Sequence, residues 1–464
     1  MLIVPGRPAP HALNWWALAH DGAPPQLQIL GPNAAAATIQ THPLARPGDN
    51  GAAGNAFLVR AQGLTEDAPY ELRATHPASA PQHSHSRTLP EQLAPNASFT
   101  IALASCYCFA RDPGVGRFYP PKLHEPPGGD PIRLRILCGD QIYMDLSPST
   151  GYPILVNAPE PWSRYLEQWD AARYRTFLER SPNVCMADDH EFWNDYPHGN
   201  AWLRWDENGP GGPLGMAMDR AYEVFQTALN IDPAAAFPTT PAFHAAWRNG
   251  ARTFQIDVPP LSLFFLDTRT ARTRFDVDVP LMVPNAWIDR LRVWLRNPVQ
   301  YKVLVLSQPA VEARSSWFQR LSHTMGDVNL PDYRAQFATL WEEIFASPRD
   351  VLVLSGDIHW SRAYEVRRMG HARAKVHEVI SSPLVKIPLG SADRGDEQGK
   401  VEWPAPAGVA HWTRRYATTA EETYSTLTFT PFDQKLRVQA RAWKVPSETG
   451  LGAELRRSTE FFLE

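Results

Sequence analysis

Four short polar clusters, each placed directly after an apolar run, hold the side chains best suited to chemistry. The first is Ser105-Cys106, at the end of the run FTIALA. A thiolate binds iron or zinc strongly, although a free cysteine is more often a small buried residue. The second is GDQIY, where Asp140 and Tyr143 follow a glycine that permits a turn. A carboxylate can bridge two cations and a phenolate suits Fe³⁺, whereas the alternative is a turn aspartate beside a packed tyrosine.

The third and fourth clusters add carboxylates and imidazoles. The third is DDHEFWND, residues 188–195, which follows the apolar VCMA. Because adjacent carboxylates repel, burying Asp188 and Asp189 without a cation is costly, and the apolar run before them argues against an exposed acidic loop. The fourth is SGDIHWSR, residues 355–362. In an extended backbone Asp357 and His359 face the same side, as in many metal sites, although this pair alone is weak evidence.

Taken together, the four clusters predict a metal centre. The expected ligands are mostly oxygens, with one thiolate and at least one imidazole. Such a set suits two or more unlike metals, a trivalent iron near Cys106 and Tyr143 and a harder divalent ion near the carboxylates. Cys138 and Cys185 lie inside apolar runs and are expected in the core. Cys108 is assigned to neither class.

The elements that must position these clusters are buried strands alternating with helices. The apolar runs begin at residues 99, 132, 183, 261, 301, 350 and 375. Helical patterns occupy 164–180, 217–230, 286–297 and 333–346. Near-continuous apolar strands alternating with helices predict an α/β fold whose sheet is buried on both faces. The polar clusters would then gather at the carboxyl ends of the strands, where open α/β sheets place their sites.

The two ends of the chain have a different sequence pattern. Residues 1–95 contain short β-like runs separated by turn signals, typical of a small β-sandwich domain. The polar segment 76–98 is interpreted as a linker, and its His76, His83 and His85 as solvated side chains rather than metal ligands. The polar clusters belong to a domain over 96–395. Residues 396–464 are expected to form a β extension that completes it, with a closing hairpin from STLTFTPFD and KLRVQARAWKV.

The composition of the chain limits which binding partners and which cellular compartment are expected. The chain has 464 residues with 45 Lys and Arg against 49 Asp and Glu, a net charge of −4. This balance gives no electrostatic reason to expect nucleic acid or an anionic membrane as a partner. No apolar run is long enough to span a bilayer, and no signal peptide or twin-arginine signal is recognised, so a cytoplasmic location is expected. The absence of a G-x-S-x-G or P-loop pattern near a suitable strand does not support a serine hydrolase or nucleotide kinase.

The chain resembles the PhoD-like alkaline phosphatase/phosphodiesterase family of the calcineurin-like metallophosphoesterase superfamily. The matching motifs are ASC at 104–106, GDQIYMD at 139–145, DDHEFWNDY at 188–196, FFLDTRTAR at 264–272, LSQP at 306–309, SGDIHWSRA at 355–363 and ISSP at 380–383. The resemblance implies an αββα metallophosphoesterase sandwich preceded by a small all-β sandwich. It also implies hydrolysis of phosphomonoesters, phosphodiesters or both, through a metal-activated water at a mixed-metal site.

The resemblance also implies roles for individual residues. Cys106, Tyr143 and His359 would hold Fe³⁺, and Asp140 would bridge to a divalent metal held by Asp189 and Asp357. That metal resembles the Ca²⁺ of characterised members, with Zn²⁺ or Mn²⁺ as alternatives. Asp188 is a further candidate ligand whose direct contact with metal is left open. His190 would lie near the phosphate as an electrostatic stabiliser or proton donor, and Asn194 and Arg362 are candidates for contacting phosphate oxygens.

Two other functions remain open on the sequence alone. The chain could be a non-catalytic metal- or phosphate-binding protein of the same fold, or a two-metal hydrolase acting on another bond. The substrate would be a small-molecule or polymeric phosphate ester, and neither its identity nor the oligomeric state follows from the sequence. Five tryptophans flank the third cluster and either pack in the core and loops or form a substrate wall: Trp162, Trp169, Trp193, Trp202 and Trp205.

Overall fold

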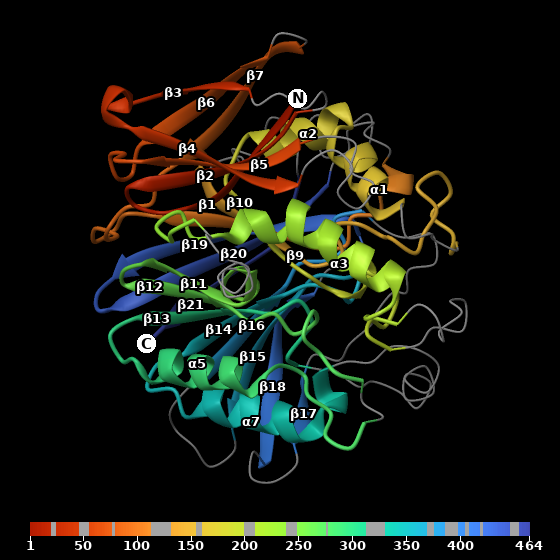
Figure 1. Ribbon diagram of the computed structural model, residues 1–464. Helices are drawn as coiled ribbons and strands as arrows, with labels where there is room; N and C mark the ends of the chain where they lie inside the picture. The colour runs from red at the N-terminus through yellow and green to blue at the C-terminus, as the bar shows by residue number, and fades with distance from the viewer. Residues whose placement is uncertain are drawn as a thin grey trace.

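The computed structural model describes residues 1–19, 25–45, 55–76, 79–112, 131–154, 160–198, 209–237, 248–274, 277–311, 330–368, 375–385, 398–403, 408–417, 421–445 and 454–464. β-Sheets dominate this mixed α/β structure, with helices packed on their outer faces (Figure 1). Within the described residues, no helix is both long and apolar enough to cross a membrane.

The N-terminal residues form two small antiparallel sheets, at the top of Figure 1. A four-stranded sheet has the order β1-β2-β5-β4 and a three-stranded sheet the order β3-β6-β7. One apolar core joins them, with Trp15 and Val59 from the first sheet and Leu72 from the second. The strands are β1 (Leu2–Pro8), β2 (Ala12–Ala19), β3 (Gln26–Leu30), β4 (Thr38–Ala45), β5 (Asn55–Gln62), β6 (Pro69–His76) and β7 (Ser79–Arg87).

Strand β7 corrects the predicted linker. Ser79–Arg87 pairs with β6 along its length, although its sequence, SAPQHSHSR, is polar. Its buried positions are occupied by small serines, Ser84 and Ser86, so the apolar alternation typical of a strand is missing. His83 lies 2.5 Å from a carboxylate oxygen of Glu71 on the neighbouring strand. In the described part of the chain, none of the three histidines of this segment belongs to a group spaced to hold a metal ion.

A six-stranded sheet has the order β10-β9-β8-β19-β20-β21. Strands β8, β9 and β10 are parallel, and β19 pairs antiparallel with β8, so the expected C-terminal hairpin β19–β20 extends the sheet. The strands are β8 (Phe99–Ala104), β9 (Ile132–Cys138), β10 (Asn183–Met186), β19 (Thr423–Phe432), β20 (Lys435–Lys444) and β21 (Glu454–Leu463).

An eight-stranded sheet has the order β11-β12-β13-β14-β16-β15-β18-β17. Its central strands β12, β13, β14 and β16 are parallel, as the near-continuous apolar runs predict. The strands are β11 (Phe254–Val258), β12 (Leu261–Phe265), β13 (Tyr301–Val305), β14 (Val351–Ser355), β15 (Arg362–Arg368), β16 (Lys375–Ile380), β17 (Gln398–Trp403) and β18 (Gly408–Ala417).

The two large sheets share one apolar core, to which both contribute, for example Ile136 from β9 and Val303 from β13. A second core lies between the eight-stranded sheet and helices α5 (Asn285–Arg296) and α7 (Arg334–Phe345). A third joins the six-stranded sheet to α1 (Glu160–Trp169), α2 (Ala172–Glu179), α3 (Pro213–Phe225) and the four-stranded sheet. The single helix expected over 164–180 is in fact two helices, α1 and α2, which are interrupted at residues 170–171.

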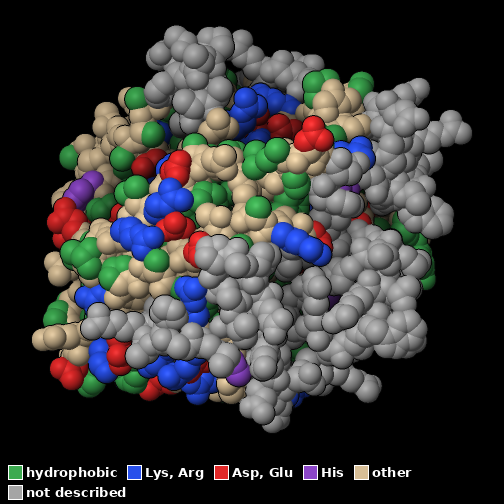
Figure 2. Space-filling view, turned by 90° about the horizontal axis from the view of Figure 1, so that it is seen from below, with side chains coloured by type: hydrophobic (Ala, Val, Ile, Leu, Met, Phe, Trp, Pro, Cys, Tyr) green, Lys and Arg blue, Asp and Glu red, His purple; other side chains and the backbone are tan. Residues whose placement is uncertain are grey.

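Charged side chains on the lower face are mixed in sign. Viewed from below, Lys and Arg lie among Asp and Glu wherever residues are described (Figure 2). Arg292 and Arg296 of α5, for example, both pair with Glu343 of α7, at 2.8 and 2.7 Å. This interspersion agrees with the small net charge of −4.

Candidate metal centre

The four predicted clusters meet at one edge, where β8, β9 and β10 of one sheet and β14 of the other end. Three groups of side chains there have ligand atoms that all lie within 4.8 Å of one another. Asp140 belongs to every group, which is the arrangement expected of a carboxylate that bridges two cations. The groups are Cys106, Asp140 and His359; Asp140, Asp189 and His190; and Asp140, Asp188, Asp189 and Asp357.

The backbone at this edge is unusual because four of the candidate ligands have positive φ. The values are 58° at Cys106, 53° at Asp140, 71° at Asp357 and 57° at His359. The left-handed region costs a non-glycine residue ~1 kcal/mol or more, and such residues cluster at functional sites. Strand ends alone would not require this conformation. It aims side chains from separate strands at a common point.

Close packing of the strand ends explains the glycine that precedes Asp140. Gly139 has φ +85°, and a Cβ built on it would lie 2.6 Å from the Cβ of Asp188. Any side chain at this position would push the Asp188 loop away from the Asp140 loop. Gly139 is thus required both by its conformation and by the close approach of β9 and β10.

One side of Asp140 holds soft and phenolic donors. The Cys106 thiol lies 3.5 Å from Asp140 Oδ2, and the Tyr143 hydroxyl donates to that oxygen at 3.4 Å. The same hydroxyl lies 3.3 Å from Nε2 of His359. Burial raises the pKa of the Cys106 thiol to about 12, and Ser382 Oγ donates to its sulfur at 3.1 Å. A thiol, a phenol, an imidazole and a carboxylate thus converge, a donor set that suits iron.

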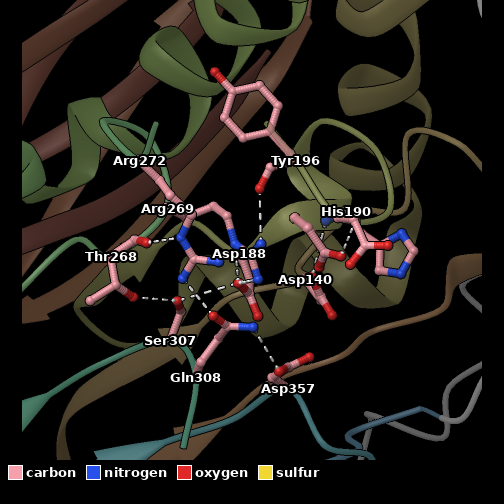
Figure 3. Close-up of polar contacts among 12 residues, drawn as sticks. Asp140, Asp188, His190, Tyr196, Thr268, Arg269, Arg272, Ser307, Gln308 and Asp357 are labelled. Carbon is pink, nitrogen blue, oxygen red and sulfur yellow. Dashed lines mark hydrogen bonds and ion pairs between the residues drawn. The ribbon is translucent and has the colours of Figure 1, made fainter. Parts of the chain in front are cut away.

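The other side of Asp140 is rich in carboxylates (Figure 3). Burial raises the pKa of Asp188 to about 6 against the opposing effect of Arg269. Burial and the neighbouring Cys106 raise the pKa of Asp140 well above its ordinary value. Asp188 Oδ1 accepts from Arg269 Nε at 2.6 Å, whereas its Oδ2 is buried without a hydrogen bond. An orphaned buried oxygen among like charges fits a bound cation.

Arg269 is a site residue that sequence reasoning missed. It is 1% exposed, contacts Asp188, and donates from Nη1 to the carbonyl of Tyr196 at 2.9 Å. The sequence feature that could have identified Arg269 is its position in FFLDTRTAR, directly after an apolar run. Burial alone would lower the pKa of Arg269, but Asp188 and Asp189 raise it above its ordinary value. This guanidinium holds Asp188 in place and offsets part of the acidic charge.

A second chain of contacts reaches Asp357 from the same loops. Arg272 Nη2 donates to Gln308 Oε1 at 2.6 Å, and Gln308 Nε2 donates to Asp357 Oδ2 at 3.2 Å. Both residues fall in motifs that carry the family resemblance, but the resemblance gave them no role. They orient Asp357 toward the remaining carboxylates (Figure 3).

His190 reaches the cluster because Asp189–Glu191 forms a turn of 3-10 helix. An extended backbone would have aimed Asp189 and His190 in opposite directions. His190 Nδ1 lies 2.7 Å from Asp145 Oδ1, and its ring packs on Tyr143 with centroids 4.3 Å apart. Burial lowers the pKa of His190, but Asp145, Asp189 and Asp140 together raise it well above its ordinary value. Asp145 was not predicted, since its role depends on this contact.

The two predicted phosphate contacts have other partners. The Asn194 amide group donates to Asp195 Oδ2 at 2.9 Å, and its backbone N–H donates to Asp145 Oδ2 at 2.9 Å. Arg362 is 2% exposed, donates to the carbonyl of Val311, and lies 3.6 Å from Glu378. The contact of both residues with phosphate stays a prediction. The interactions of Arg362 with Val311 and Glu378 do not support such a contact for Arg362.

The remaining cysteines and the three described tryptophans of the predicted set pack in the interior. Cys138 and Cys185 are buried as expected, and Cys108, which was left unassigned, is also buried. Trp162, Trp169 and Trp193 are buried too, which favours the packing interpretation over a substrate wall. Trp202 and Trp205 lie outside the described residues.

Comparison with known proteins identifies the fold. No family model and no curated protein sequence matches the chain. A solved structure described as "Structure of PhoD" superposes with a TM-score of 0.67 at 16% sequence identity. The alignment covers 99% of this chain and 89% of that chain. At this identity the likeness shows the fold, which extends over the N-terminal sheets, both large sheets and the edge where the ligand groups lie.

Proposed function

We propose that this chain is a distant member of the PhoD-like family and a metal-dependent phosphoesterase with the αββα arrangement of metallophosphoesterases. Its site would hold Fe³⁺ beside Cys106, Tyr143 and His359, and a divalent ion, Ca²⁺ or alternatively Zn²⁺ or Mn²⁺, beside Asp189 and Asp357. Asp140 would contact both ions. The observation that carries the proposal is that three ligand groups share Asp140, on a fold like that of PhoD.

The donor chemistry fits metal ions better than it fits a purely structural network. Several buried carboxylates and a buried thiol lie beside one another, and among the described residues Arg269 and His190 form ion pairs with carboxylates of this site. Burying unbalanced charge costs several kcal/mol per ion, on the order of the stability of a whole domain. Bound metal ions would offset this cost, and they supply Lewis acidity that activates water and neutralises charge on a phosphoryl group.

The chain's own residues would orient the substrate and move a proton. The contact of His190 Nδ1 with Asp145 fixes the ring, and Nε2 would be the ring nitrogen that contacts a phosphate ester. A protonated His190 can stabilise charge on the phosphate or donate a proton to the leaving oxygen. Arg269 maintains the position of Asp188 and does not itself need to contact the substrate.

Turnover assays with and without chelator test this function. We expect hydrolysis of p-nitrophenyl phosphate, bis-p-nitrophenyl phosphate or both, abolished by chelation and restored by metal. Binding of metal and phosphate without turnover of either ester would favour a non-catalytic protein. Inactivity toward both esters, with metal-dependent hydrolysis of another bond, would favour a different two-metal hydrolase.

A further inference from the structure

Glu191 lies at the centre of the site yet belongs to none of the three ligand groups. We propose that Glu191 is a positioning residue that fastens the Asp140 loop to the Asp188–Asp189 loop and so sets the spacing of the metal ligands. This inference rests on the proposed metal centre. It assigns a role to a carboxylate that neither binds metal nor touches substrate.

The contacts of Glu191 join two strand ends. Its Oε2 accepts from the backbone N–H of Asp140 at 2.9 Å and of Asp188 at 2.8 Å. Its Oε1 accepts from the backbone N–H of Gln141 at 2.7 Å and from Nε2 of Gln226 at 3.1 Å. Asp140 follows β9 and Asp188 follows β10, so one side chain ties both loops together. The side chain is fully buried, which makes each of these bonds hard for water to replace.

The pattern of donors requires a carboxylate at this position. Each oxygen of Glu191 accepts two hydrogen bonds, so all four of its acceptor positions face donors. A glutamine has the same shape, but its amide nitrogen would face two N–H donors in either orientation. The substitution would therefore force the two loops apart or leave buried N–H groups unsatisfied. The hydrogen bond from its backbone N–H to Glu191 Oε2 also helps to hold Asp140 in its left-handed conformation.

Residues of α3 and the residue that follows it support the side chain of Glu191. Gln226, which follows α3, donates from Nε2 both to Oε1 of Glu191 and to the hydroxyl of Tyr165 at 3.0 Å. Phe225, the residue before it, stacks on Tyr165 at 4.7 Å and packs against Trp16 of β2 at 5.0 Å. Contacts therefore run from the N-terminal sheet through α3 to the loops that carry the ligands. Through Gln226, Glu191 connects this packing to the backbone N–H groups of the two loops.

Metal titration of Glu191→Gln separates positioning from general stabilisation. The matched control is Asp350→Asn, because Asp350 is another buried carboxylate that ties two distant backbone N–H groups, those of Lys375 at 2.8 Å and Glu464 at 3.2 Å. Asp350 precedes β14, at the opposite end of that strand from Asp357. Wild type and both variants are stripped with chelator and titrated with Mn²⁺ or Ca²⁺ alone, following the rise in melting temperature.

We expect Glu191→Gln to bind the added metal ~10-fold or more weakly, the usual effect of losing a group that orients ligands. Asp350→Asn should lower the melting temperature of the metal-free protein but keep wild-type metal affinity. Unchanged metal affinity in folded Glu191→Gln would overturn the proposal. Equal loss of affinity in both variants would also overturn it, since the effect would then be general.

A milder variant covers the case in which Glu191→Gln does not fold. Gln226→Met keeps the side-chain length and removes one of the four donors, so metal affinity should fall by about fivefold, as for one lost hydrogen bond. Wild-type affinity in Gln226→Met would then contradict the role. If wild-type protein itself takes up no metal, the proposed metal centre fails and this role with it, an outcome distinct from a failure of Glu191 alone.

Discussion

The edge where the candidate ligands meet and the interior between the same two sheets are both largely buried, but they differ in backbone conformation and in the kind of side chain they hold. The interior consists of regular strands and apolar side chains, with His377 of β16 as a polar exception, stacked on Phe461 of β21 at 4.1 Å. Burial lowers the pKa of His377 to about 4, so the ring is neutral near pH 7. At the edge, strands end in left-handed residues and several carboxylates lie together.

The difference shows where the fold tolerates the free-energy cost of burying ionisable groups. Inside, a titratable group without hydrogen-bond partners becomes neutral and behaves as a ring that fills space. At the edge, Asp188 and Asp189 are held by Arg269 and by the backbone N–H of Asp195, at 2.6 and 2.7 Å. The edge thus gathers ionisable groups that are costly to bury without a cation, which is expected of a site that binds cations.

The largest effect is expected from Asp140→Asn. A neutral amide cannot supply the charge shared by all three ligand groups, so at least one metal should be lost. Activity should fall by ~10³-fold or more, equivalent to several kcal/mol of transition-state stabilisation. Steady-state kinetics and elemental analysis measure both effects. Kinetics like those of wild type would contradict the bridging role, and His377→Leu is the interior control that should keep its metals.

His190→Ala should retain metal but lose turnover by ~10²–10⁴-fold, the range for a general acid or base. The loss should be larger for an alkyl phosphate than for p-nitrophenyl phosphate, whose leaving group needs no proton. Asp145→Asn should show the same substrate dependence in weaker form, because Asp145 orients the ring. An equal loss on both substrates would leave only an electrostatic role, and metal loss in parallel with activity would make His190 a ligand or its support.

Tyr143→Phe should change the visible spectrum rather than the fold. If the phenolate binds Fe³⁺, the wild-type protein is coloured by a charge-transfer band and the variant is bleached. Absorption spectroscopy on protein of known iron content measures this directly. A colourless, iron-free and fully active wild-type preparation would remove the iron assignment.

The smallest effect concerns acid stability of the interior. His377 has a folded-state pKa of about 4 against ~6.5 when unfolded, so the unfolded chain takes up the proton first as pH falls. The stability linked to the neutral ring is full above pH ~6.5 and decreases down to pH ~4. Chemical denaturation should therefore show that His377→Leu loses ~2–3 kcal/mol less than wild type between pH 7 and 4.5. Identical losses would place the acid sensitivity elsewhere.

The strands and the convergence of the candidate ligands could be predicted because buried strands are recognisable in the sequence as apolar runs. Each long apolar run became a strand, and polar residues directly after it lie at the strand's carboxyl end. Strand β7 was missed because its buried positions are serines. Helices α1 and α2 were merged because the helical pattern continues across their break at 170–171.

The supporting residues of the site could not be predicted in the same way. Glu191, Asp145 and Arg269 act through backbone N–H groups or side chains of other loops, so their roles depend on how distant segments pack. Glu191 was visible only as one more acid in an acidic cluster. Its four donors come from three separate segments of the chain. Spacing along the sequence carries no record of such contacts.

Elemental analysis of the purified chain, combined with an assay of the same sample, decides whether activity depends on the proposed metals. We expect iron together with a divalent ion, and activity toward a phosphate ester that falls as either metal is removed. A fully active preparation that contains neither metal would contradict this expectation.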